Sequence, residues 1–207
     1  MIGMGGISEP EEREVADAVT TPQEWRVFLE RYGELYVHAY SDGGDELVDL
    51  LEEEELEAFD RGERVKPWLG EAPAREEALA AAEERLGVRF PPGVRGFFLA
   101  SDGWTPLAAS WVGGVRPCDR VVWMRDSEAG RSVTEIYDSI PGNEEEVQLF
   151  RRSVEIAQGE DFWLLDPTDV GPDGEWATYK FAPKYGNPTR YPNFYALFRS
   201  GYNYMKG

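Results

Sequence analysis

Two side chains in this sequence have the reactivity that nucleophilic or proton-transfer catalysis uses most often, and each residue type occurs once: His38 and Cys118. His38 lies near the end of a helical pattern, beside aromatic residues, which favours a structural role. Cys118 follows Pro117 in an expected loop between strands, where Arg116 and Arg120 are close enough in sequence to lower the pKa of its thiol. Because no histidine accompanies it, we expect an inert or mildly oxidisable thiol. A single cysteine also excludes an intrachain disulfide and a cysteine-based zinc site.

Carboxylates are the other candidates for catalysis or metal binding, and the sequence has 40 of them. Asp161 and Asp166 flank an expected strand and Glu175 opens the next, but among so many acids such a pair has little weight without geometry. The stretch 166–175 only loosely resembles a calcium loop, and a hairpin turn explains the same residues. The Gly113-Gly114 pair lacks the lysine and hydroxyl residue of a phosphate-binding loop. We therefore expect no catalytic residue, no metal and no cofactor.

The charge of the chain indicates the kind of partner that it could bind. The formal net charge is −19 at pH 7, and 18 of the acidic residues lie among the first 60 residues, with only three arginines there. Such a field repels nucleic-acid phosphates and anionic lipids, so we expect no direct nucleic-acid or membrane binding. It attracts a basic protein and speeds its association in a salt-dependent way. The alternative is that the acidic surface only keeps the protein soluble.

The candidate contact residues form an acidic set and an aromatic pair. Leu47, Leu50 and Leu51 start an expected helix that continues through four adjacent glutamates. Four consecutive glutamates cover all sides of a helix, so the segment is either weakly docked or a presented acidic surface. Trp104 and Trp111 flank a loop just past an expected helix end, where an aromatic side chain can be half exposed and anchor a partner. The predicted partner-binding residues are Asp45, Glu46, Asp49, Glu52, Glu53, Glu54, Glu55, Glu57, Trp104 and Trp111.

A strong helix signal opens the ordered part of the chain. Thr21 and Glu24 form a capping box around Pro22, and an apolar stripe runs from Trp25 to Tyr36. We expect residues 1–20 to be a disordered lead, residues 21–67 an acidic helical extension and residues 68–207 the core domain. No stretch approaches the roughly 18–20 apolar residues of a membrane span, and the N-terminus lacks a signal-peptide pattern, so we expect a cytoplasmic protein.

The core region begins with two helices and continues as strands. Residues 78–86 have helical periodicity, Gly87 can end that helix, and Pro92 starts a second, apolar helix. Short β-branched and aromatic runs then predict strands, and residues 191–198 predict a closing helix with Asn193 as a possible cap. The expected strands are 111–115, 120–124, 133–137, 147–150, 154–157, 162–165 and 176–181. This pattern predicts an α+β fold, with helices packed on a twisted, mainly antiparallel sheet of about six strands and an N-terminal helical extension.

The order of these elements resembles the SUKH superfamily, which includes fungal Smi/Knr cell-wall regulators and many bacterial toxin-immunity proteins. The resemblance covers residues 68–204 and rests on motifs that are weak singly but fairly specific in their order. They are a helical glutamate followed by Leu86-Gly87, the pair Pro91-Pro92, the aromatic helix and its final small-residue turn, Phe162-Trp163-Leu164-Leu165-Asp166-Pro167, Gly174-Glu175-Trp176 and Arg190-Tyr191-Pro192-Asn193-Phe194. Residues 21–59 lie outside the family's core pattern, so the resemblance says little about the acidic segment.

The resemblance implies a non-enzymatic immunity protein that neutralises a cognate toxin, as in toxin–antitoxin systems, by covering the active or substrate site of the toxin. A nuclease toxin binds phosphate through a basic groove, which the carboxylates of residues 45–57 could occupy. The fungal relatives imply an alternative, a regulatory or scaffold interaction protein with several partners. A carboxylate-based hydrolase is the third possibility, for which the sequence offers no distinctive nucleophile or metal set.

Overall fold

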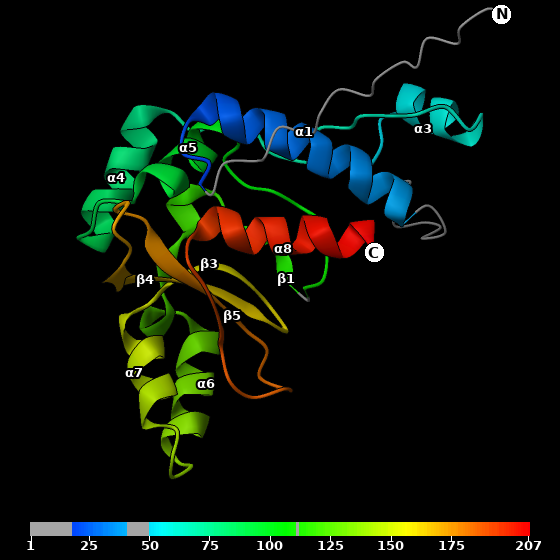
Figure 1. Cartoon of the computed structure of the whole chain (residues 1–207). Coiled ribbons are helices and arrows are strands. Elements are labelled where there is room, and N and C mark those ends of the chain that lie inside the picture. The colour runs from blue at the N-terminus through cyan, green and yellow to red at the C-terminus, as the bar shows by residue number, and fades with distance from the viewer. Residues whose placement is uncertain (1–17, 41–49, 111) are drawn as a thin grey trace, which may run out of the picture.

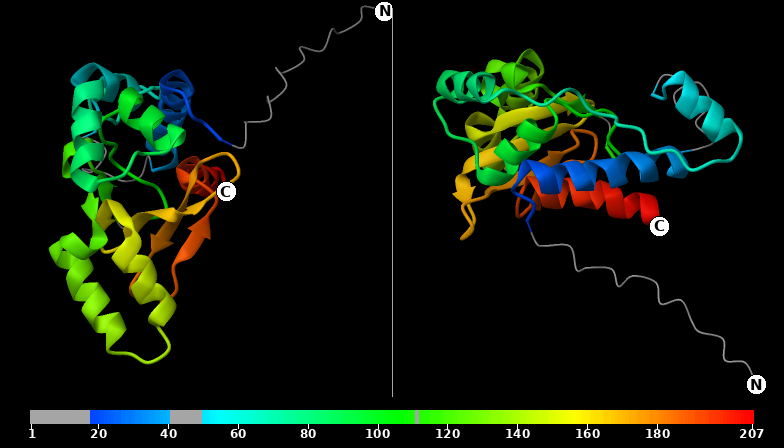
Figure 2. Two further views of the ribbon diagram at one scale, coloured as in Figure 1. Left: turned by 90° about the vertical axis from the view of Figure 1, so that its left-hand side faces the viewer. Right: turned by 90° about the horizontal axis from the view of Figure 1, so that it is seen from above.

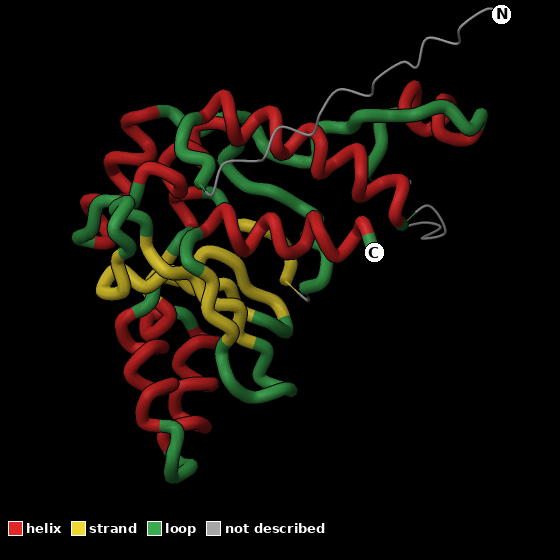
Figure 3. The backbone as a smooth tube through the Cα atoms, viewed as in Figure 1, coloured by secondary structure: helices red, strands yellow, loops and turns green. Residues whose placement is uncertain are grey.

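The protein is an α+β sandwich with helices on both faces of one sheet. The computed structural model describes residues 18–40, 50–110 and 112–207. These residues form seven α-helices and a six-stranded antiparallel sheet (Figures 1 and 3), which confirms the predicted fold class. The helices are α1 (Pro22–Ala39), α3 (Glu53–Asp60), α4 (Glu76–Leu86), α5 (Pro92–Ala100), α6 (Glu128–Asp138), α7 (Glu144–Arg152) and α8 (Phe194–Lys206). Helices α1, α4, α5 and α8 share the main hydrophobic core with one face of the sheet, and α6 and α7 cover the other face.

The sheet is buried on both faces by alternating side chains. Its strands are β1 (Val112–Val115), β2 (Val122–Trp123), β3 (Val154–Gly159), β4 (Phe162–Val170), β5 (Trp176–Phe181) and β6 (Thr189–Tyr191). They pair in the order β1-β3-β4-β5-β6, and β2 also pairs with β3. Along β4, Trp163 and Leu165 pack into the main core, whereas Phe162 and Leu164 pack beneath α6 and α7. This alternation follows from the two-residue period of a strand.

The first and last helices each begin after the capping residue that the sequence predicted. At the start of α1 the Thr21 hydroxyl accepts from the Glu24 N–H at 3.3 Å, and the Thr21 N–H donates to the Glu24 carboxylate at 2.9 Å. At the start of α8 the Asn193 side-chain oxygen accepts from the Ala196 N–H at 2.8 Å. Both caps satisfy N–H groups that the first turn of a helix leaves without partners. Helix α8 lies on the sheet, and α1 packs alongside α8 (Figures 1 and 2).

Helix α1 belongs to the main core, although the sequence placed it in an extension. Trp25 is fully buried, and its ring lies edge-on to Phe97 of α5 at 5.3 Å and to Phe198 of α8 at 5.4 Å. Its indole N–H donates to the carbonyl oxygen of Gly93 at 2.7 Å. Val19, assigned to the lead, is buried as well. Packing therefore crosses the boundaries that were predicted at residues 20 and 67; residues 1–17 lie outside the described residues.

Helices α4 and α5 form as predicted. Gly87 ends α4 in the left-handed conformation, with φ at 69°, and Pro92 opens α5. Gly96 in α5 permits a close crossing, because a Cβ atom there would lie 2.2 Å from the carbonyl oxygen of Thr20. The chain that leads into α1 thus runs directly over α5.

Two of the predicted strands are helical. Residues 133–137 and 147–150 lie in α6 and α7, a helical hairpin that projects from the sheet (Figure 1). The Ser127 hydroxyl caps α6 by accepting from the Gly130 N–H at 2.9 Å. Val133 and Tyr137 lie one helical turn apart and pack together beneath the sheet. The strand prediction was wrong because short apolar runs do not distinguish a helical face from a strand. Strand β6 was not predicted.

Helix α3 is shorter than predicted and is held by a small cluster of its own. It begins at Glu53, so Leu50 and Leu51 precede the helix, and Leu47 lies outside the described residues. Leu51 packs with Val37 and Val65 in a cluster separate from the main core. Both Figure 1 and the right-hand view of Figure 2 show α3 standing away from the other helices.

Candidate partner-binding surface

The acidic residues predicted to bind a partner cover the exposed side of α3. Glu53, Glu54 and Glu57 are exposed, as is Glu52 immediately before the helix. Glu57 keeps 68% of its side chain accessible although Arg61 lies 3.8 Å away. Negative charge in the first turn of a helix is favourable, because the N-terminal end of the helix dipole is positive. Helix α3 can therefore present several carboxylates and remain helical. The predicted residues Asp45, Glu46 and Asp49 lie outside the described residues.

Two of the four consecutive glutamates have a local structural role. The Glu52 N–H donates to the Glu55 carboxylate at 3.2 Å, which satisfies one N–H at the helix start. Because the helix starts only at Glu53, the glutamates lie in and before its first turn and do not surround its apolar side. On that side Phe59 faces the ring of His38, with the ring centres 5.8 Å apart. Within α3 itself, the exposed carboxylates left for a partner are those of Glu53, Glu54 and Glu57.

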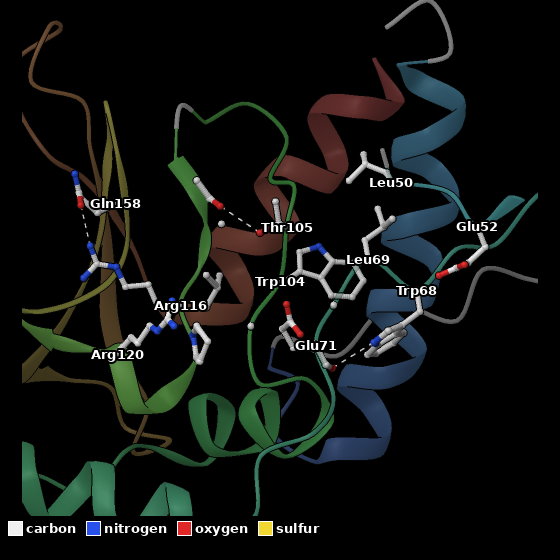
Figure 4. A pocket seen from close by; sticks show the side chains of 16 residues that line it. Leu50, Glu52, Trp68, Leu69, Glu71, Trp104, Thr105, Arg116, Arg120 and Gln158 are labelled. Atoms are coloured by element: carbon white, nitrogen blue, oxygen red, sulfur yellow. Dashed lines mark hydrogen bonds between the residues drawn. The ribbon is translucent and has the colours of Figure 1, made fainter. Parts of the chain in front are cut away.

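A groove of about 870 Å³ separates the α3 segment from strand β1 (Figure 4). Trp104 forms isolated antiparallel bridges to Gly70 and to Val115, so the chain extends the sheet beyond β1 at this point. The approach is close at Gly114, whose φ is 116° and where a Cβ atom would lie 2.0 Å from the Thr105 hydroxyl oxygen. Only glycine permits this backbone conformation together with this contact. The fold thus builds the groove from segments that are far apart in the sequence.

Opposite charges line the two sides of this groove. Arg116 and Arg120 lie on the β1 side, and Glu71 and Glu52 lie on the other side (Figure 4). Neither glutamate forms an ion pair with the residues that the structure describes, nor does Arg120. The groove is therefore polarised, and within the described part of the chain both sides keep charge that has no ion-pair partner.

Arg116 is held in place by a buried acid. Its guanidinium lies 2.7 Å from the carboxylate of Glu155, whose side chain is completely buried, and donates to the Gln158 side-chain oxygen at 2.8 Å. Glu155 also accepts from the Ser127 hydroxyl at 2.6 Å. Burial raises the pKa of Glu155, and the Ser127 hydrogen bond and Arg116 act in the opposite direction. From the sequence, Arg116 was expected only to act on the thiol of Cys118. The signal for this ion pair was Glu155, a lone glutamate inside the apolar run 154–157.

Trp104 lines the groove but is not half exposed, so that prediction was wrong. Only 1% of its surface is accessible, because the chain turns inward after α5 and pairs with strand β1. Its ring lies edge-on to Trp68 at 5.3 Å. The Trp104 indole N–H has no hydrogen-bond partner among the described residues. Trp111 lies outside the described residues.

The surroundings of Cys118 and of His38 fit structural roles. Cys118 is fully buried, and burial together with the neighbouring Asp102 carboxylate raises the pKa of its thiol to about 12. The expectation that Arg116 and Arg120 lower this pKa was wrong, since Arg116 is paired with Glu155 and burial dominates. His38 is half buried against Phe59.

The carboxylates of Asp166 and Glu175, in the strand region, are also buried, and each binds other groups of the protein. Asp166 lies 2.8 Å from Arg152 and accepts from the Thr168 hydroxyl at 2.7 Å. Glu175 accepts from the Gly93 N–H at 2.7 Å, and burial raises its pKa. Each of these acids holds one element against another. Within the described ranges, no group of three or more His, Cys, Asp or Glu side chains could hold a metal ion.

Comparison with known proteins adds no relative. No model of a protein family matches the chain, and no curated protein matches it. Among the described residues, no helix is both long and apolar enough to cross a membrane.

Proposed function

We propose that this chain is a cytoplasmic, non-enzymatic protein-binding module that neutralises a basic protein toxin, in the manner of SUKH immunity proteins. The observation that carries the proposal is the set of exposed carboxylates on α3, a helix that projects from the body and is attached through a small apolar cluster. A toxin that acts on nucleic acid needs a basic groove to bind phosphate, and carboxylates on a projecting helix can occupy such a groove.

Two further observations support this proposal. The net charge of −19 draws a basic protein from a distance and speeds its association. The segments that carry the SUKH resemblance form a helix pair (α4 and α5), a strand pair (β4 and β5) and the last helix (α8). These are the kinds of element that the resemblance implies.

The experiment is a tagged pull-down from the source cells, with a variant and a matched control. The variant carries Glu53→Gln, Glu54→Gln and Glu57→Gln, which removes three charges and spares the helix start at Glu52 and Glu55. The control carries Glu144→Gln, Glu145→Gln and Glu146→Gln, the same charge change in the first turn of α7. We expect one stoichiometric basic partner that the wild type and the control capture at low salt, that high salt releases, and that the α3 variant does not retain.

A growth assay separates neutralisation from a regulatory or scaffold role. The captured partner, expressed alone, should stop growth, and the wild-type chain should restore it. Several weak partners without toxicity would favour the regulatory alternative. Capture that is equal for the α3 variant and the wild type would contradict the role of α3.

A further inference from the structure

The groove beside β1 has charged side chains on both sides that form no ion pair with any described residue. Arg120 is exposed at the end of the short 3₁₀ turn Cys118–Arg120, next to Arg116. Arg116 is fixed by Glu155 and Gln158, so its position is set before any ligand arrives. On the other side Glu71 is exposed, and Glu52 lies further along (Figure 4).

The surface between the charges is aromatic and glycine-rich. Trp68 is half buried and packs edge-on against the buried Trp104, while the exposed Gly113 of β1 presents main chain instead of a side chain. Such a surface suits a chain that brings apolar and main-chain groups together. The volume of about 870 Å³ lies within the range of ligand-binding clefts.

We propose that this groove binds an extended polypeptide segment that has an acidic side chain on Arg120 and a basic side chain facing Glu71 and Glu52. A small free anion fits less well, because the two glutamates and the net charge of −19 repel it. A segment that carries both charges satisfies both sides and is bound in one direction only. The inference needs only the groove, so it stands or fails independently of the role proposed for α3.

Capped peptides test this proposal. The probes are three pools of fluorescent hexapeptides, N-acetylated and C-amidated so that only side chains carry charge. The first pool has an acid near the N-terminal end and a base near the C-terminal end, and the second pool has the reverse order. The third pool has asparagine and glutamine at both positions. We expect one of the two charged orders to bind by fluorescence polarisation, and Arg120→Glu to weaken that binding at least tenfold. Arg89→Glu, an exposed arginine outside the groove, is the matched control and should change the affinity little.

Three outcomes of this titration would overturn the proposal. The neutral pool could bind as well as the charged pools, Arg120→Glu could leave the affinity unchanged, or no pool could bind at millimolar concentration. Displacement of the peptides by succinate at equal concentration would also reject a polypeptide segment, because it would indicate a site for small anions.

The indole N–H signals in a proton–nitrogen NMR spectrum give a second readout. The Trp104 N–H lies in the groove region without an acceptor among the described residues, and Trp68 lines the groove beside it. Saturating peptide should move the Trp68 and Trp104 signals and leave Trp25 in place, because its N–H is bonded to Gly93 inside the core. A spectrum in which neither groove indole moves would contradict binding at this place.

Discussion

The guanidinium of Arg116 lies 2.7 Å from the carboxylate of Glu155, which has no accessible surface, whereas Arg116 keeps 25% of its side chain accessible. The pair therefore links the interior to the groove. Through the Ser127 hydroxyl, Glu155 also contacts the cap of α6. One buried acid thus connects the groove, the sheet and the helical hairpin.

Removing Arg116 should destabilise the protein more than removing a surface arginine would. In Arg116→Ala the buried Glu155 loses its counter-ion, and we expect a loss of about 3 kcal/mol at pH 8, at the low end for an uncompensated buried charge. The pKa of Glu155 is already raised by burial and should rise further without Arg116. At pH 4 the folded state can bind the proton, so the loss should be smaller there. Urea unfolding of this variant and of Arg120→Ala, expected within about 0.5 kcal/mol of wild type, checks this.

Glu175 should make the protein less stable as pH rises. Burial raises the pKa of Glu175 in the folded state, so its contribution to stability is largest below the pKa of the unfolded chain and is lost as pH rises through the folded value. Glu175→Gln keeps an acceptor for the Gly93 N–H and removes the charge. We expect the variant to melt above wild type at pH 8, by roughly 2–4 °C for each kcal/mol gained.

That difference should shrink as pH falls to 4, because the unfolded chain then also protonates Glu175 and the raised pKa favours the neutral form in the folded protein. Glu77→Gln, at an exposed position of α4, should show no such dependence. A pH-independent difference for Glu175→Gln would show that hydrogen bonding or packing, and not the buried charge, decides the effect.

The Cys118 thiol should be almost unreactive in the folded protein. A pKa of about 12 leaves few thiolates at pH 8, and burial blocks access to the sulfur. Labelling with an aromatic disulfide reagent should be orders of magnitude slower without denaturant than in urea. Equal rates in the two conditions would mean that the region around Asp102 and Cys118 opens freely.

Residues 68–207 should not fold cooperatively when α1 is removed. Trp25 packs against α5 and α8, so its loss exposes the apolar sides of both helices. In the full chain, Trp25→Ala should cost about 3–5 kcal/mol. Thermal unfolding followed by near-ultraviolet circular dichroism tests both variants. A fragment that melts sharply near the temperature of the full chain would support the predicted domain boundary at residue 67.

Rules that act within one helix were enough to predict much of the fold. The capping box at Thr21, the glycine at the end of α4 and the Asn193 cap lie where the sequence placed them. The α6–α7 hairpin was missed because its short apolar runs, such as residues 147–150, fit a helical face as well as a strand. The position of α1 depends on tertiary packing, which a sequence pattern does not contain.

The acidic surface of α3 and the groove also differ in how far the sequence could predict them. The acids of α3 are adjacent in sequence, so composition alone pointed to them. The groove combines Glu71, Trp104, Arg116 and Gln158, which the fold brings together from four segments. Burial of Trp104 followed from its pairing with β1, and no local pattern indicates that pairing.

The association rate of the captured partner, measured against salt, tests the central claim most directly. Wild type and the α7 control should associate fast at low salt and slow down as salt screens the charges. The triple α3 variant should associate several-fold more slowly at low salt and respond less to salt. Equal rates and equal salt dependence for all three proteins would contradict the claim that α3 draws in and binds a basic partner.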